Sequence, residues 1–355
     1  MKIQEKKMTL QTRISRRSII LNEKRGKFMI KAMYSGVSGM KANQTKLDVI
    51  GNNVANAGTT SFKKSSARIT DSFYQTVLYA SAPTAALGGT NLGQVGVGSK
   101  ISSINKDMVQ GNVQPTNRPS DLMIDGDGYL PVVRQGTVMY TRDGSFNLDT
   151  GFKAADGALK NIKGGRLVNG DGYMLQGMIY DGEYKADTGE FVKKGDAKGK
   201  EPIVIPLQSI SPKDGTVQNV LEYNISKDGT VEFLLSDGQR TQFVYDIPDG
   251  AKVGDTPAGI DKLKGTIQKV QIYAFQNPAG LDAAGGNLFK PSANSGDPQI
   301  AGATGTIIQG AIEASNVDIA EEFTEMIIAS RSFQANSKII STSDEILQEI
   351  INLKR

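Results

Sequence analysis

The 355-residue sequence contains no cysteine, no histidine and no tryptophan. The missing cysteines exclude disulfide bonds and thiolate chemistry, and the missing histidines exclude imidazole-based triads and histidine-ligated metals. No apolar run approaches the roughly 20 residues that a membrane-spanning helix needs. Carboxylates, serines, lysines and tyrosines remain as possible catalytic groups, and we expect no membrane insertion.

The positive charge of the chain is concentrated in a basic leader, residues 1–28. This leader holds nine Lys or Arg against two Glu, whereas the whole chain has a net charge of +4, so the remainder is mildly acidic. A basic arm for nucleic acid or membranes is one interpretation. A secretory signal is another, but Ile19-Ile20-Leu21 is too short for its apolar stretch. We favour a mis-assigned start with translation beginning at Met29, because the coding sequence for residues 23–27 is compatible with a purine-rich ribosome-binding site just upstream. We expect no nucleic-acid surface on the body.

Alternating steps of four and three between apolar residues predict an N-terminal helix over residues 29–56. The stripe consists of Met33, Val37, Met40, Gln44, Leu47, Gly51 and Val54, with Ile50 beside it. Asn52, Asn53 and Asn56, followed by Gly58, predict the end of this helix. Residues 57–100 then have the composition of an extended glycine-rich linker.

Ten Asp-Gly pairs lie between Asp125 and Gly250, and none occurs elsewhere. Asp-Gly favours turns with positive φ, which close β-hairpins. Short strand-like runs separate the pairs: Leu130–Val133, Ile203–Leu207, Val231–Leu235, Gln242–Tyr245 and Val270–Phe275. We therefore predict antiparallel β-domains, with a first domain over 101–170 that returns at 266–305 and an outer domain or insertion over 171–265.

The C-terminal part, residues 306–355, returns to a helical pattern with Asn316 as the expected N-cap. One line follows steps of four and three through Ile319, Phe323, Met326, Ser330, Phe333, Ser337, Ile340, Asp344, Leu347 and Ile351, and seven of these ten residues are apolar. A second line lies on another face and contains Ile328, Ala335, Ile339, Ile346, Ile350 and Leu353. The N-terminal helix is too short to cover both lines. We expect the uncovered line to find partners in other chains, against the alternative of a two-helix core within a monomer.

Candidate catalytic and binding motifs fail on spacing. Lys63-Lys64-Ser65 lacks the second glycine of a phosphate loop. Asp121, Asp125 and Asp127 miss the later ligand positions of a calcium loop and are expected in turns. We therefore expect no enzyme activity, cofactor or metal. A β-rich carbohydrate-active enzyme or lectin, and an autonomous coiled-coil adaptor, remain as alternative functions.

Three stretches resemble the axial proteins of the bacterial flagellum, which are the rod, hook and filament-junction subunits. They are Met33–Met40 running into Leu47–Asn56 and Thr60–Lys63; Asp121–Tyr129 with Tyr140–Phe146; and Asn277–Leu281, Asn287–Phe289 and Gly310–Val317 with the helix that follows. This resemblance implies an α+β fold, with coiled-coil-like N- and C-terminal helices packed together and central, mainly antiparallel β-domains. The glycine-rich Gly88–Gly98 is similar to hook subunits of Gram-positive bacteria, whereas Tyr140–Phe146 also resembles the distal rod.

The resemblance implies a subunit of the flexible hook, with the distal rod as the alternative. It implies self-assembly into a helical tube, with the distal rod protein and the hook–filament junction protein at its ends. A hook cap and the flagellar export apparatus would assist assembly, outside the cell and without a cleaved signal peptide. The expected assembly residues are Met33, Met40, Leu47, Ile50, Asn52, Asn53, Asn56, Phe62, Asn316, Val317, Phe323, Met326, Phe333, Ile340 and Leu347.

Overall fold

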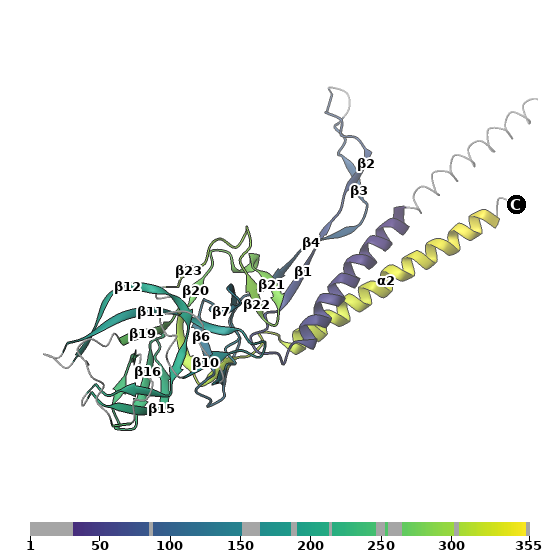
Figure 1. The fold of residues 1–355 in the computed structure, drawn as a ribbon. Helices are drawn as coiled ribbons and strands as arrows, with labels where there is room; N and C mark the ends of the chain where they lie inside the picture. The colour runs from purple at the N-terminus through teal and green to yellow at the C-terminus, as the bar shows by residue number, and fades with distance from the viewer. Residues whose placement is uncertain are drawn as a thin grey trace, which may run out of the picture. The chain divides into compact units, whose positions relative to one another are not determined.

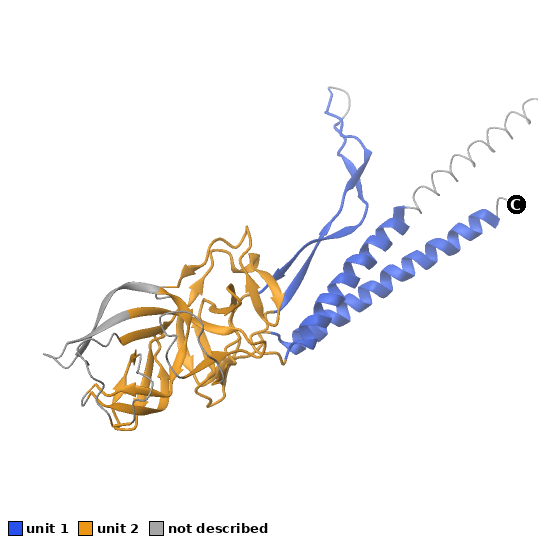
Figure 2. Cartoon of the chain, in the orientation of Figure 1, with its two compact units in different colours: residues 1–57, 64–107, 317–355 blue, residues 58–63, 108–316 orange. Residues whose placement is uncertain are grey.

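The computed structural model describes residues 31–84, 88–150, 164–185, 190–212, 215–245, 253–254, 265–301 and 305–352. The chain divides into two compact units, coloured separately in Figure 2. Unit 1 comprises residues 1–57, 64–107 and 317–355, and unit 2 comprises residues 58–63 and 108–316. The basic leader lies outside the described residues.

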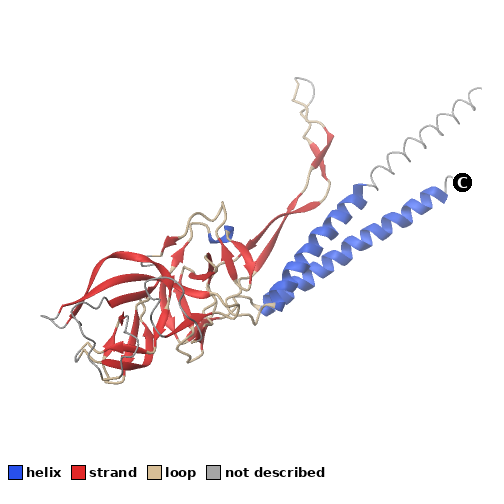
Figure 3. Cartoon of the chain, viewed as in Figure 1, coloured by secondary structure: helices blue, strands red, loops and turns tan. Residues whose placement is uncertain are grey.

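Unit 1 contains an N-terminal helix, described over residues 31–55, and the helix α2 (Ile319–Asn352) (Figures 1 and 3). No glycine or proline interrupts α2, which allows its length. The side chain of Asp318 caps it, because its Oδ1 accepts hydrogen bonds from the backbone N–H groups of Ala320 (2.8 Å) and Glu321 (3.3 Å). The predicted N-cap, Asn316, was therefore wrong by two residues.

A two-stranded ribbon, residues 65–106 and here called the arm, follows the N-terminal helix. It consists of β1 (Ser65–Asp71), β2 (Tyr74–Leu78), β3 (Gly93–Gly96) and β4 (Ser99–Lys106). β1 pairs with β4 and β2 with β3, both antiparallel. The segment that we expected as an extended linker over 57–100 therefore folds back on itself as a hairpin.

The arm meets the N-terminal helix at Gly98. This residue has φ +137°, and a Cβ there would lie 2.0 Å from Oγ of Ser38. The next backbone N–H, of Ser99, donates to the same Oγ at 3.3 Å. Only glycine combines this backbone conformation with so close an approach.

Unit 2 is built around an eleven-stranded sheet in which every described pairing is antiparallel. Its central path runs in the order β13-β10-β11-β7-β8-β22-β21, while β12 and β19 pair with β11, β18 pairs with β19, and β9 pairs with β10. The strands are β7 (Leu130–Arg134), β8 (Thr137–Thr141), β9 (Asn147–Asp149), β10 (Gly164–Val168), β11 (Met174–Lys185), β12 (Glu190–Pro202), β13 (Val204–Pro206), β18 (Phe243–Tyr245), β19 (Gly265–Val270), β21 (Asp282–Gly285) and β22 (Leu288–Lys290).

Smaller antiparallel groups complete unit 2. A four-stranded sheet has the order β14-β15-β16-β17, and three strand pairs are β5 with β25, β6 with β24, and β20 with β23. Their bounds are β5 (Val113–Pro115), β6 (Leu122–Gly126), β14 (Gln208–Ile210), β15 (Val217–Ile225), β16 (Val231–Leu235), β17 (Arg240–Thr241), β20 (Tyr273–Ala274), β23 (Gln299–Ile300), β24 (Gly305–Gln309) and β25 (Ala311–Glu313). A 3-10 turn, η2 (Pro278–Gly280), lies between β20 and β21.

Residues 305–313 form β24 and β25, although we assigned 306–355 to the C-terminal helix. Each strand pairs with a strand from the start of unit 2, so that Ile307 lies opposite Ile124 and Glu313 opposite Val113. The last strands of the unit are thereby held against its first ones.

The core of unit 2 has an aliphatic and an aromatic part. Leu122, Phe146, Leu175 and Phe233 lie in the larger cluster and have no exposed surface. Tyr129, Tyr140, Tyr273, Phe275 and Phe289 form a second cluster, in which rings meet edge to face at 5.0–5.7 Å between centroids.

The α+β fold class, with terminal helices and a mostly antiparallel strand-rich middle, is confirmed. The finer expectation, that the helices pack as a coiled coil, stays a prediction. Among the described helices, none is long and apolar enough to cross a membrane.

Candidate assembly surface

The two helices of unit 1 lie side by side in opposite directions. The ammonium group of Lys46 is 3.0 Å from the carboxylate of Glu325, and Nδ2 of Asn53 donates to Oε2 of Glu322 at 3.1 Å. Residues later in the N-terminal helix thus meet residues earlier in α2. Just beyond the N-terminal helix, Lys64 pairs with Glu321 at 3.1 Å.

α2 nevertheless exposes many large apolar side chains, each between 44 and 62% accessible. They are Ile319, Phe323, Ile327, Ile328, Ile339, Ile346 and Ile351. Exposed apolar side chains gathered on a surface mark an interaction site. Ile328, Ile339 and Ile346 belong to the second predicted line and are here called the exposed strip. The N-terminal helix leaves these three uncovered, and Leu353 of the same line lies outside the described residues.

The first predicted line lies differently. Met326, Phe333, Ile340 and Leu347 are half-buried, and Ile340 contacts the N-terminal helix at Gly36. Only Phe323 among the expected assembly residues of α2 is largely exposed, at 49%. The middle of the first line, from Met326 to Leu347, therefore serves the pairing within one chain. Exposed surface is offered by the second line and by the ends of the first, at Ile319, Phe323 and Ile351.

The expected assembly residues of the N-terminal helix are also partly used within the chain. Met33, Met40 and Leu47 are half-buried, whereas Ile50 is 3% accessible. Asn53 is 1% accessible and makes its described hydrogen bonds inside unit 1.

The remaining expected residues lie around the helix ends. Nδ2 of Asn56, a half-buried residue, donates to Oδ1 of the exposed Asn52 at 3.0 Å. Phe62 and Val317 are half-buried, and Nδ2 of Asn316 donates to the carbonyl of Val109 at 3.2 Å. That these residues take part in contacts between chains stays a prediction for all of them.

The arm is a second exposed apolar surface, which the sequence analysis missed. Its exposed large side chains are Ile69, Phe73, Tyr74, Val77, Leu78, Tyr79, Leu92, Val95 and Ile104, with Tyr79 the most accessible at 82%. Residues 72–99 contain no charged side chain. The signal was present in the sequence as a 28-residue stretch that is free of charge and contains Phe73, two tyrosines and three leucines. Its five glycines led us to interpret it as a linker.

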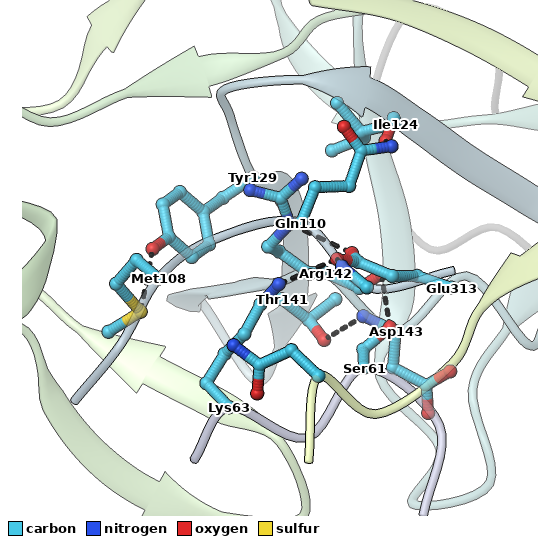
Figure 4. A network of polar contacts seen from close by, with 12 residues as sticks. Ser61, Lys63, Met108, Gln110, Ile124, Tyr129, Thr141, Arg142, Asp143 and Glu313 are labelled. Atoms are coloured by element: carbon cyan, nitrogen blue, oxygen red, sulfur yellow. Dashed lines mark hydrogen bonds and ion pairs between the residues drawn. The ribbon is translucent and has the colours of Figure 1, made fainter. Parts of the chain in front are cut away.

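A buried ionic network lies in unit 2, at the segments that connect to both helices (Figure 4). The carboxylate of Glu313, in β25, is 2.6 Å from Nζ of Lys63 and 2.9 Å from Nε of Arg142. All three side chains are at most 2% accessible. Lys63 comes from the segment after the N-terminal helix, and five residues separate Glu313 from the first residue of α2.

Backbone groups complete the network. Oε1 of Glu313 also accepts the N–H of Gly111 at 2.8 Å, while Lys63 donates to the carbonyl of Val109 (2.8 Å) and Arg142 to that of Gly126 (2.7 Å). Two cations thus share one carboxylate, and the carbonyl groups stabilise the extra positive charge. In the sequence, Lys63, Arg142 and Glu313 stood out only as members of a failed phosphate loop or of the stretches that carry the resemblance, and none of them was predicted to form an ion pair. A glutamate within the apolar run of β24 and β25 was the available signal.

Within the described ranges, no group of three or more acidic side chains gathers where it could hold a metal ion.

Three family models match the chain. Residues 33–63 match "Flagella basal body rod protein", residues 123–233 match "Flagellar hook protein FlgE/F/G D1 domain", and residues 308–353 match "Flagellar basal body rod FlgEFG protein C-terminal". These segments contain most of the motifs that carried the resemblance.

Curated relatives of both kinds are similar to this chain. The flagellar basal-body rod protein FlgG of Bacillus subtilis (strain 168) is 40% identical over 332 residues, which cover 92% of this chain and 100% of the relative. The FlgG of Borreliella burgdorferi is 34% identical with the same coverage. The flagellar hook protein FlgE of B. burgdorferi is 27% identical over 445 residues, again covering 92% of this chain and 100% of the relative.

Proposed function

Because this chain belongs to the rod and hook family of bacterial flagellar axial proteins, we propose that it is a structural subunit that polymerises with copies of itself, and that it forms the flexible hook. The family consists of structural components of the flagellum and not of enzymes. The observation that carries self-assembly is the apolar strip of α2, which its own N-terminal helix leaves exposed.

The exposed arm supports the same function. Its accessible aromatic and aliphatic residues include an uncharged stretch, residues 72–99, and the described part of unit 1 leaves them exposed. Neighbouring subunits in a polymer would cover them. Burying such surface in many equivalent contacts stabilises an assembly by about 25 cal/mol for each Å² of apolar area removed from water.

The distal rod is the second candidate, and the lengths of the alignments support it. Several FlgG proteins align over their full length with few additional residues, whereas the alignment with the hook protein of B. burgdorferi extends over 445 residues. That hook protein therefore carries segments that this chain lacks. The hook remains our first choice because Gly88–Gly98 is similar to hook subunits, as the sequence analysis found.

As a hook subunit the chain would contact the distal rod protein at one end of the tube and the hook–filament junction protein at the other. During assembly it would pass through the flagellar export apparatus without a cleaved signal peptide and fold beneath a hook cap. These partners are part of the proposal and follow from the family's architecture.

A charge on the exposed strip tests self-assembly. We expect Ile328→Asp to abolish sedimentable polymer, because Ile328 is 57% accessible and its burial against a neighbour would trap an unpaired carboxylate. The matched control is Gln334→Asp, at an exposed polar position of the same helix. Phe333 is a poorer test site, because it is half-buried and a charge there would also disrupt the pairing within the chain. Normal polymerisation of Ile328→Asp would contradict the proposal.

Electron microscopy of concentrated protein separates the two candidates. A hook subunit should form curved, flexible tubes, and a distal rod subunit should form straight, stiff ones. Straight rods under all conditions would overturn the hook assignment and leave self-assembly intact.

A further inference from the structure

The buried face of α2 repeats every seven residues. Met326, Phe333, Ile340 and Leu347 form one row, and Glu322, Ala329, Asn336 and Ser343 form the adjacent row. All eight side chains are buried or half-buried. Because the apolar row repeats so evenly, sliding α2 by seven residues along the N-terminal helix would leave its apolar contacts almost unchanged. Apolar packing alone therefore does not fix the register of the pair.

The first feature that distinguishes one register is a notch of small residues in the N-terminal helix. A Cβ at Gly39 would lie 2.7 Å from Nδ2 of Asn336, and one at Gly36 would lie 3.2 Å from Cγ1 of Ile340. Gly36 and Gly39 are both buried. The absence of side chains at these two positions makes room for the amide of Asn336 at one height along α2.

The second feature is Asn53, which joins three segments of unit 1. Its Nδ2 donates to Oε2 of Glu322 (3.1 Å) and to the carbonyl of Ser65 (2.8 Å), while its Oδ1 accepts the N–H of Ser65 (3.0 Å). Asn53 is 1% and Glu322 7% accessible. Ser65 is the first residue of the arm, so the amide ties the end of the N-terminal helix to the start of α2 and to the start of the arm.

We propose that Asn53–Glu322 and Gly39–Asn336 set the register of the two helices, as positioning residues. In a pair slipped by seven residues, Ala329 would face Asn53 and Ser343 would face Gly39. The carboxylate of Glu322 would lose its buried partner, and the notch would be left partly empty. A slip in the other direction would bring Ser315 opposite Asn53. Ser315 lies before the first residue of α2 and is not helical.

The register determines the position of the exposed strip of α2 relative to the N-terminal helix and the arm. A slip of seven residues moves α2 by about 10 Å along its axis, at 1.5 Å per residue. Ile328 and Ile339 would then occupy different heights relative to the N-terminal helix and the arm. In a regular polymer, Ile328 and Ile339 need to lie at the same height in every subunit. The register itself is a property of one chain and exists without polymerisation.

Engineered cysteine pairs can report the register, because the chain has no cysteine of its own. Lys46→Cys with Glu325→Cys reports the observed register, since these side chains form an ion pair. Lys46→Cys with Ser332→Cys reports the slipped register. Each pair is oxidised in dilute full-length protein, and the cross-link within one chain is quantified by mass spectrometry, with and without the added double substitution Glu322→Ala, Asn336→Ala.

The double substitution makes the two registers nearly alike, because Asn53 then faces alanine in both, while Gly39 faces alanine in the observed register and Ser343 in the slipped one. We expect the first pair to cross-link in the otherwise unchanged chain, to fall at least threefold in the double variant, and the second pair to rise correspondingly. The control, Gln334→Ala with Glu349→Ala, changes two exposed positions of α2 and should leave both yields unchanged.

Two results would overturn this proposal. One is an absent first cross-link in the unchanged chain, and the other is an unaltered first cross-link in the double variant. The latter would mean that the short connection before α2, not these side chains, sets the register. Failure to polymerise would overturn the proposed function alone, because the cross-links are measured in single chains.

Discussion

Glu313 holds a position in unit 2 that no other described residue duplicates. Its carboxylate is the acidic partner of two buried cations, Lys63 and Arg142. Each cation also donates a hydrogen bond to a backbone carbonyl. A buried ion pair contributes little relative to an apolar replacement, but loss of one member leaves an uncompensated charge. The network is therefore sensitive to single substitutions.

We predict that Glu313→Gln lowers the free energy of unfolding of unit 2 by roughly 3–5 kcal/mol, the range for breaking a buried ion pair. The amide keeps the shape but removes the charge that both cations share. Urea unfolding measures the effect. Glu222→Gln, at an exposed position of β15, is the control and should change the free energy by about 0.5 kcal/mol or less. Equal effects of the two substitutions would contradict the prediction.

Tyr129 couples the stability of the same region to alkaline pH. Burial raises the pKa of its phenol to about 12, whereas an unfolded tyrosine titrates near 10. The folded chain thus keeps a proton that the unfolded chain has lost. This contribution to stability is complete below about pH 10 and disappears as the pH rises through 12.

We predict that Tyr129→Phe lessens the loss of stability between about pH 10 and 12, by up to 1.4 kcal/mol per pH unit. The substitution removes only one weak hydrogen bond, to Sδ of Met108 at 3.6 Å. Urea midpoints across this range provide the measurement, and Tyr34→Phe, at a residue 65% accessible, is the control. If Tyr129→Phe and Tyr34→Phe follow the same pH profile, the phenol of Tyr129 does not supply the effect.

Among the elements, the turns could be predicted from the sequence, but the pairing of the strands could not. Gly172, Gly229 and Gly238 each follow an aspartate and have positive φ, and they close the β10–β11, β15–β16 and β16–β17 hairpins. Gly126 also follows an aspartate and has positive φ, yet β6 pairs with the distant β24. Turn chemistry is local and can be recognised in a sequence, whereas this pairing joins segments about 180 residues apart.

The arm shows the same limit. Its glycines predicted a loose linker, but Gly96 pairs with Tyr74 in an antiparallel ladder. Glycine lacks the packing surface that makes a strand recognisable, so its place in a ribbon depends on the partner strand. Gly98 is needed for another reason, its close approach to Ser38.

We predict that Gly98→Ala detaches the arm from the N-terminal helix without unfolding unit 2. The new methyl group would collide with Oγ of Ser38, and alanine disfavours the positive φ. Limited proteolysis at Phe73, Tyr74 and Tyr79 should accelerate several-fold, because local opening exposes the ribbon. Gly96→Ala is the control, since the nearest contact of its new methyl group would be an ordinary 3.7 Å, to the ring of Tyr74. Cleavage rates that rise equally in both variants would refute the role of Gly98.

At the scale of the whole molecule, the location of helices at the two ends of the chain and of strands between them could be predicted from the sequence. The helical periodicities at the two ends and the Asp-Gly turns between them predicted the α+β fold. The ionic network was not predictable, because Lys63 and Glu313 are 250 positions apart and only the tertiary fold brings them together. The two compact units follow the fold and not the order of the chain, as unit 2 includes residues 58–63.

The discontinuous makeup of unit 2 leads to a prediction about fragments. A fragment of residues 58–316 retains Lys63, Arg142 and Glu313, and we expect it to fold and unfold cooperatively without forming polymers, because it lacks α2. A fragment of residues 108–316 keeps the sheets but loses Lys63 and the hydrogen bond from the N–H of Ser61 to the carbonyl of Glu313 (2.8 Å). Its free energy of unfolding should be lower by roughly 3 kcal/mol or more, as for a buried ion pair that loses one partner. Urea unfolding of the two fragments measures the difference, and equal stabilities would show that residues 58–63 are not an integral part of unit 2.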